Sequence, residues 1–174
     1  MVQLEELDAD APPPDLEEIP GAELSARILA CDGLWLASEL ALQEGGLLTG
    51  KGVNHLCVFG AIPNVPGVEA FHEKRRHAYV RAENGALITH LRKCCDFIGE
   101  AIAGDGQVAV LSEEEGEAGA AFLIGAYLIL EKGMRADDAA DAVVASRPAS
   151  GIKEHREFMK NLRFLERNGI PDWA

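Results

Sequence analysis

The chain has 174 residues, of which 48% are hydrophobic, and its 29 acidic and 16 basic side chains give a formal net charge of −13. This length favours a single domain that folds without a disulfide or a structural metal, and the sequence has neither the long apolar run of a membrane helix nor the basic and then apolar start of a signal peptide. The charge argues against nucleic acid and anionic membranes as partners, and the spacing of the cysteines at positions 31, 57, 94 and 95 predicts reduced thiols in the cytoplasm.

Residues 1–22 come first, and their composition predicts an extended tail. They hold seven acidic residues, no basic residue and four prolines. Such a segment cannot bury enough apolar surface to fold alone. Two alternatives stay open, because the tail is either solvated or docked on a partner protein.

Residues 23–167 alternate short apolar strands with amphipathic helices, and residues 168–174 are predicted to be a C-terminal tail. Residues 22–31 show a pattern that is weakly helical or irregular, and glycines interrupt the chain at 50 and 52. The predicted strands are 34–36, 53–59, 77–80 and 108–111. The predicted helices are 38–42, 88–102, 120–130, 136–146 and 153–167. This alternation indicates an α/β fold.

The segment between the strand 108–111 and the helix 120–130 is a candidate anion site. A strand, a tight loop and a helix N-terminus together hold phosphate through backbone N–H groups and the helix dipole. Here residues 112–119 read Ser-Glu-Glu-Glu-Gly-Glu-Ala-Gly, with four acids within five positions. Without these four acids and the seven of the tail, the rest of the chain carries only −2. Much of the negative charge is therefore predicted to lie where an anion would bind.

This segment resembles the signature region of the dual-specificity protein phosphatases, which is a strand, His-Cys-x-x-Gly-x-Ser-Arg-Ser, and a helix that ends in Ala-Tyr-Leu. Aligned on Ala126-Tyr127-Leu128, the signature glycine falls on Gly116. Weaker matches follow in the family's order at 34–38, 52–58, 96–98, 147–148 and 158–166. The resemblance covers roughly residues 23–167 and implies a mixed central sheet of about five strands flanked by helices.

The sequence departs from the signature at the positions that carry the chemistry. Ser112 replaces the His, Glu113 replaces the nucleophilic Cys, and the Ser and the phosphate-binding Arg are replaced by Ala118 and Gly119. In the family a thiolate attacks phosphorus and the Arg clamps the phosphoryl oxygens. The loop acids would also repel a dianionic phosphate ester, namely Glu113, Glu114, Glu115 and Glu117. The resemblance therefore implies a pseudophosphatase with no phosphate ligand and no cofactor.

The general-acid loop of the family has a weak counterpart, since only Glu83 offers a carboxyl group there. His90 and Cys94 have the spacing of metal ligands on a helix, but without a third ligand no metal site is predicted. The dense basic patch Lys74-Arg75-Arg76-His77 is either a solvated edge or a contact for an acidic protein surface. Trp173, near the C-terminus, either packs on the body of the domain or contacts a partner.

Three functions remain as hypotheses. The first is a catalytically inactive module that binds proteins or supports a larger assembly, for example a cytoskeletal or ciliary one. The second is a soluble signalling regulator that competes with active phosphatases for a partner protein. The third is an enzyme of another kind that uses Glu113 or Glu115 as a base, although no matching nucleophile or cofactor loop accompanies them.

Overall fold

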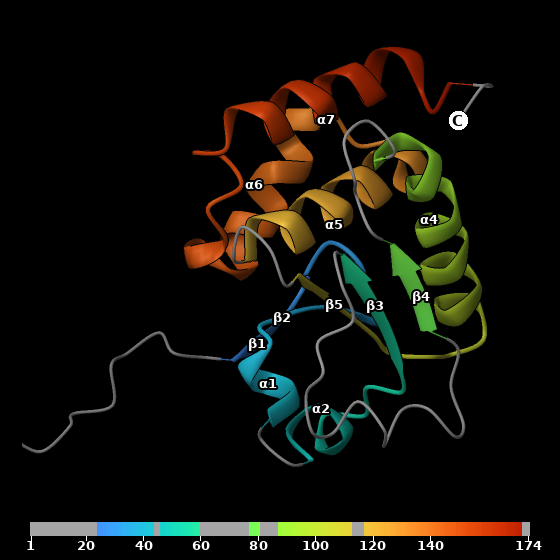
Figure 1. Ribbon diagram of the computed structural model, residues 1–174, viewed down its shortest axis with the longest axis vertical. Coiled ribbons are helices and arrows are strands. Elements are labelled where there is room, and N and C mark those ends of the chain that lie inside the picture. The colour runs from blue at the N-terminus through green and yellow to red at the C-terminus, as the bar shows by residue number, and fades with distance from the viewer. Residues whose placement is uncertain (1–23, 44–45, 60–76, 81–86, 113–116, 172–174) are drawn as a thin grey trace, which may run out of the picture.

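The computed structural model describes residues 24–43, 46–59, 77–80, 87–112 and 117–171, which form a five-stranded sheet with helices on both faces (Figure 1). The strands are β1 (Ser25–Arg27), β2 (Leu34–Ala37), β3 (His55–Phe59), β4 (His77–Val80) and β5 (Val108–Ser112), in the spatial order β1-β2-β5-β3-β4. Only β1 and β2 pair in antiparallel fashion, and the other neighbours are parallel. The predicted mixed sheet flanked by helices is therefore confirmed.

The central strand β5 shows why the sheet is covered on both faces. All five of its residues are buried. Val108 and Val110 face one hydrophobic core, whereas Ala109 and Leu111 face a second one. This alternation follows from the period of two along a strand, and continuous apolar runs are typical of parallel strands with two buried faces.

The larger core lies under four helices, α4 (Leu87–Ala103), α5 (Glu117–Lys132), α6 (Ala136–Ser146) and α7 (Arg156–Asn168). Helix α5 packs on the sheet, and α6 and α7 pack on α5 from outside (Figure 1). Because α5 lies between two layers, twelve consecutive residues from Ala118 to Ile129 are buried. A helix that is apolar on all sides is the expected sequence for this position.

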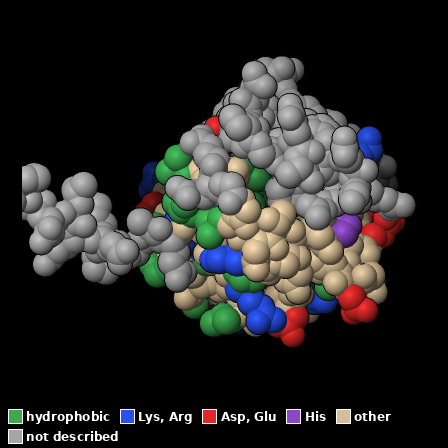
Figure 2. Space-filling model, turned by 90° about the horizontal axis from the view of Figure 1, so that it is seen from below, with side chains coloured by type: hydrophobic (Ala, Val, Ile, Leu, Met, Phe, Trp, Pro, Cys, Tyr) green, Lys and Arg blue, Asp and Glu red, His purple; other side chains and the backbone are tan. Residues whose placement is uncertain are grey.

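The smaller core lies under two short helices, α1 (Leu40–Gln43) and α2 (Leu47–Gly50). Trp35 borders this core, where its Nε1 donates to Gln107 Oε1 at 2.8 Å and the Lys51 ammonium lies 5.4 Å from its ring centroid. Figure 2 views this end of the molecule and shows basic and acidic side chains on the same face. None of the helices in the described ranges has the length and apolar character needed to cross a bilayer.

Several local predictions were wrong, and each has a physical reason. β1 lies in the segment 22–31, which was predicted to be weakly helical or irregular. The strand was missed because a three-residue edge strand owes its form to pairing with β2 rather than to its own pattern. α2 ends at Gly50, where only a chain break was predicted, and burial of Leu48 holds it in place. A short 3-10 helix, η1 (Pro148–Ser150), precedes α7, which begins three residues later than predicted.

Candidate functional site

The candidate site lies where β5 ends and α5 begins. Ser112 is the last residue of β5, is paired in register with Phe59 of β3 and is buried. Glu117 is the first residue of α5. The carboxyl end of a central parallel strand, followed by a helix N-terminus, is where open α/β sheets usually bind ligands. The predicted loop residues Glu113, Glu114, Glu115 and Gly116 lie outside the described residues.

The predicted loop 112–119 is too long at both ends, which corrects the sequence-based picture. Ser112 belongs to the strand, and Glu117, Ala118 and Gly119 form the first turn of α5. Ala118 and Gly119 are buried because this turn already packs under its neighbours. Gly119, the position of the family's phosphate-binding Arg, therefore adds no side chain to the first turn of α5.

Glu117 does not add free negative charge to the site, because its carboxylate is paired with Arg147. The Arg147 Nε donates to Oε2 at 2.7 Å and Nη2 donates to Oε1 at 2.6 Å. The side chains are only 11% exposed for Arg147 and 17% exposed for Glu117. Two parallel bonds of this kind are the strongest geometry for such a pair, and an acid in the first turn also favours the helix dipole.

Arg147 was not recognised as part of the site from the sequence. It follows α6 directly, where its N–H donates to Val143 O at 2.8 Å, and it lies 30 positions from Glu117 in the chain. No local pattern predicts a pairing over that distance. The available signal was an arginine before Pro148, in a stretch that the family resemblance already covered.

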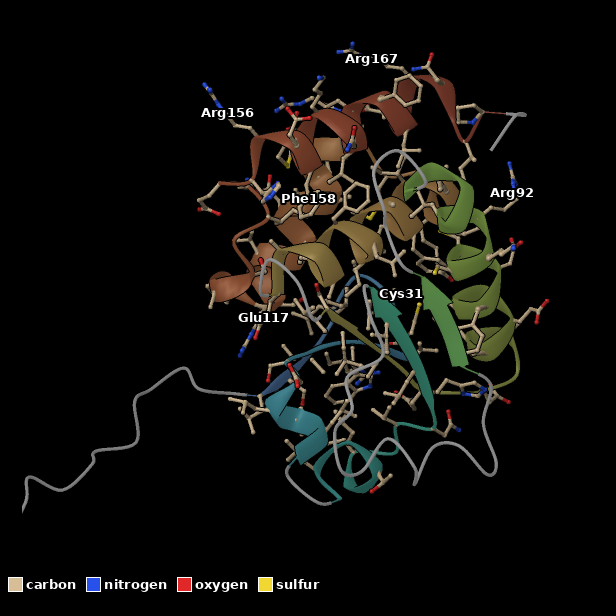
Figure 3. All side chains as sticks on the ribbon, in the orientation of Figure 1. Cys31, Arg92, Glu117, Arg156, Phe158 and Arg167 are labelled. Carbon is tan, nitrogen blue, oxygen red and sulfur yellow. The ribbon has the colours of Figure 1, made fainter. Side chains whose placement is uncertain are left out.

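The thiols decide whether a cysteine nucleophile is available elsewhere. All four cysteines of the chain lie in the described part, all are buried, and none belongs to the β5–α5 junction. A hydrogen bond with Cys94 and burial together raise the pKa of Cys57 well above the ordinary thiol value, and burial raises the pKa of Cys31 and of Cys95. Figure 3 places Cys31 beneath α5, away from Glu117 at its N-terminus.

The other predicted contact residues are not brought together with this site. Lys74, Arg75, Arg76 and Trp173 lie outside the described residues, as do residues 1–22. His77 begins β4, but its side chain is not among those described. In the part of the chain that the structure covers, no group of three or more potential metal ligands occurs.

Comparison with known proteins shows which solved structures have a similar fold. No protein-family model matches the chain, and no curated protein is similar to it in sequence at a significant level. Among solved structures, human DUSP28 is 26% identical with a TM-score of 0.63, over 83% of this chain and 93% of that one. The Yvh1 phosphatase domain from Chaetomium thermophilum is 18% identical with a TM-score of 0.69, over 84% and 98% of the two chains.

A third similar structure is the human tyrosine phosphatase-like serine/threonine/tyrosine-interacting protein. It is 20% identical with a TM-score of 0.56, over 79% of this chain and 96% of that one. All three similarities span most of both chains. The chain therefore has a dual-specificity phosphatase-like fold.

Proposed function

We propose that this domain is a pseudophosphatase, which keeps the fold of the dual-specificity phosphatases, lacks their chemistry and acts by binding protein partners. The observation that carries the proposal is the state of the thiols. Phosphoryl transfer in this family needs a cysteine thiolate in the loop after the central strand. This chain has Glu113 at that position, and its four cysteines are all buried in other elements.

The absence of a guanidinium at position 119 supports the same proposal. A phosphoryl group in flight spreads negative charge over its oxygens, which an Arg stabilises through two parallel hydrogen bonds. Gly119 cannot do this, and Arg147 already uses its Nε and Nη2 on Glu117. The acids at 113–115 would add repulsion toward a dianion. We therefore also propose that the domain has no phosphate ligand.

The test is a phosphatase assay combined with an anion-binding assay on the full chain. We expect no turnover of p-nitrophenyl phosphate and no thermal shift with millimolar tungstate or sulfate. Glu113→Ala is the diagnostic variant, and Glu131→Ala, exposed at the other end of α5, is the matched control. Clear turnover that is lost in Glu113→Ala and kept in Glu131→Ala would refute the proposal and would support an enzyme built on the loop glutamates.

The proposed role is that of a rigid protein-binding or structural block in a larger assembly, with a cytoskeletal or ciliary assembly as the specific case. The partner is sought by proximity labelling in the source cells, followed by fractionation. We expect the protein to separate with the insoluble cytoskeleton. Recovery in the soluble fraction, bound to a signalling protein whether or not that protein is phosphorylated, would instead support the competing regulator.

A further inference from the structure

The outer face of α7 carries more basic than acidic side chains. Its inner face is buried on α5 through Phe158, Met159, Leu162 and Leu165. Its outer face carries a basic row at helical spacing, namely Arg156, Lys160, Arg163 and Arg167. Figure 3 shows Arg156 and Arg167 pointing away from the body, whereas Phe158 points into it. The row is exposed in a chain with a net charge of −13.

The acids nearby neutralise this row only in part. Arg163 is paired with Asp137 at 2.9 Å, and Lys160 lies 3.9 Å from Glu157. Arg156 and Arg167 have no ion-pair partner among the described residues. The other acid of α7, Glu166, accepts a hydrogen bond from Ala136 N–H at 3.1 Å and so caps α6. The outer face therefore keeps an excess of positive charge.

The same face has an apolar centre. Phe164 is 41% exposed, which is unusual for a large hydrophobic residue in the described part of this domain. It lies in an open groove of about 500 Å³ that is lined by Lys160, Asn161, Arg163, Phe164, Arg167 and Asn168. An aromatic ring surrounded by cations and amides matches an acidic peptide that carries apolar side chains.

We propose that the acidic N-terminal segment, residues 1–22, docks on this outer face of α7. The segment has the complementary composition, since it holds seven acids and no base. Within it, Leu4 and Leu7 flank Glu5 and Glu6, so that apolar side chains for the groove stand beside carboxylates for the basic row. The tail, for which the sequence left solvation or a partner protein as alternatives, therefore also has a complementary binding site within its own chain.

The path from the tail to α7 is short enough. The Leu29 N–H donates to Ser146 Oγ at 3.2 Å, which places the chain five residues after Leu24 against the end of α6. The groove lies at the other end of α6, because Ala136 and Asp137 at the start of that helix contact Glu166 and Arg163 of α7. The path from Leu24 is therefore about 17 Å back to Leu29, about 16 Å along α6 and about 10 Å across to α7, or about 43 Å in all. Leu4 and Leu7 lie 20 and 17 residues before Leu24, and these stretches span up to about 66 Å and about 56 Å when extended, so both can reach the groove.

The experiment places a photo-crosslinking amino acid, p-benzoylphenylalanine, at Leu7 of the full chain. Irradiation of the monomer at low concentration is followed by peptide mapping. We expect the crosslinks to fall on residues 156–168, to be independent of protein concentration and to decrease at about 1 M salt, where the Debye length is about 3 Å. The Lys160→Glu/Arg167→Glu variant should lower their yield roughly tenfold, because each reversal replaces an attraction with a repulsion of similar size.

The matched control is Arg92→Glu/Lys93→Glu, which makes the same charge change on the exposed side of α4 (Figure 3). Both variants should keep the wild-type melting temperature, since all four side chains are exposed. Equal yields in the two variants, or crosslinks confined to other parts of the domain, would overturn the proposal. Crosslinks that join two chains and vanish on dilution would overturn it as well and point to an intermolecular site. The result is independent of the phosphatase assay, because α7 is not part of the β5–α5 junction.

Discussion

Arg147 and Glu117 are joined by two hydrogen bonds, of 2.7 Å and 2.6 Å, that tie the end of α6 to the first turn of α5. The resemblance to the dual-specificity phosphatases aligns Gly119, in this turn, with the Arg whose guanidinium binds phosphate in that family. Here the turn carries the acid, and the cation comes from the residue after another helix. At this corner of the fold the acid and the cation are paired with each other.

The first prediction concerns the energy of this pair. Arg147→Ala should lower the free energy of unfolding by about 3 kcal/mol, because it leaves a largely buried carboxylate without its partner. In a double-mutant cycle with Glu117→Gln, the two substitutions should couple by more than about 1 kcal/mol, as measured by urea unfolding. The exposed pair Arg27–Asp32 serves as control and should show almost no coupling. Similar coupling in both pairs would contradict the prediction.

The second prediction concerns thiol reactivity. At pH 7.5 the folded chain should show no fast reaction with a thiol reagent, whereas all four cysteines should react in urea. The reason is that burial keeps the thiols both inaccessible and protonated, as the raised pKa values of Cys31, Cys57 and Cys95 indicate. Modification of one thiol within seconds at pH 6 would reveal an activated thiolate and would argue against the proposed loss of chemistry.

The parts of the fold that were predictable from the sequence are those whose pattern is local. The strand 108–111 is an uninterrupted apolar run, and the helix 88–102 has a regular apolar spacing, so both were found within a few residues. β1 was missed because only its partner β2 makes it a strand. Glu117 was assigned to an acidic loop because its partner, Arg147, is distant in the chain and nothing in the local sequence announces it.

The third prediction concerns alkaline pH. A thiol whose pKa is raised in the folded chain ionises at a lower pH in the unfolded chain than in the folded one. Its contribution to stability is therefore complete below the pKa of the unfolded chain, about 9. It is lost as the pH rises from there toward the pKa of the folded chain. Each such thiol should steepen the decline by about 1 kcal/mol per pH unit between pH 9 and pH 10, toward a limit of about 1.4. The slope between pH 9 and pH 10 should therefore be shallower in Cys57→Ala and in Cys95→Ala than in the wild type.

Tyr127 provides the internal control for this slope. Burial raises the pKa of Tyr127 to about 12 from an ordinary value of 10.0. Its contribution is therefore lost mainly above about pH 10, and Tyr127→Phe should change the slope between pH 9 and pH 10 much less than either cysteine substitution does. Urea unfolding at closely spaced pH values measures the slopes of the wild type and of the three variants. A slope that is the same in the wild type and both cysteine variants would show that the buried thiols do not control alkaline stability.

The fourth prediction concerns the contact that fixes α7, and with it the outer face of that helix. A Cβ at Gly125 of α5 would lie 3.2 Å from Leu162 Cδ1 of α7, which is closer than side chains normally approach. In the wild type, this clash should offset the gain of about 1 kcal/mol that Gly→Ala brings in a helix. In a Leu162→Ala background the obstacle is gone, so Gly125→Ala should raise the free energy of unfolding by about 1 kcal/mol. The same effect in both backgrounds would show that Gly125 does not set the distance between α5 and α7.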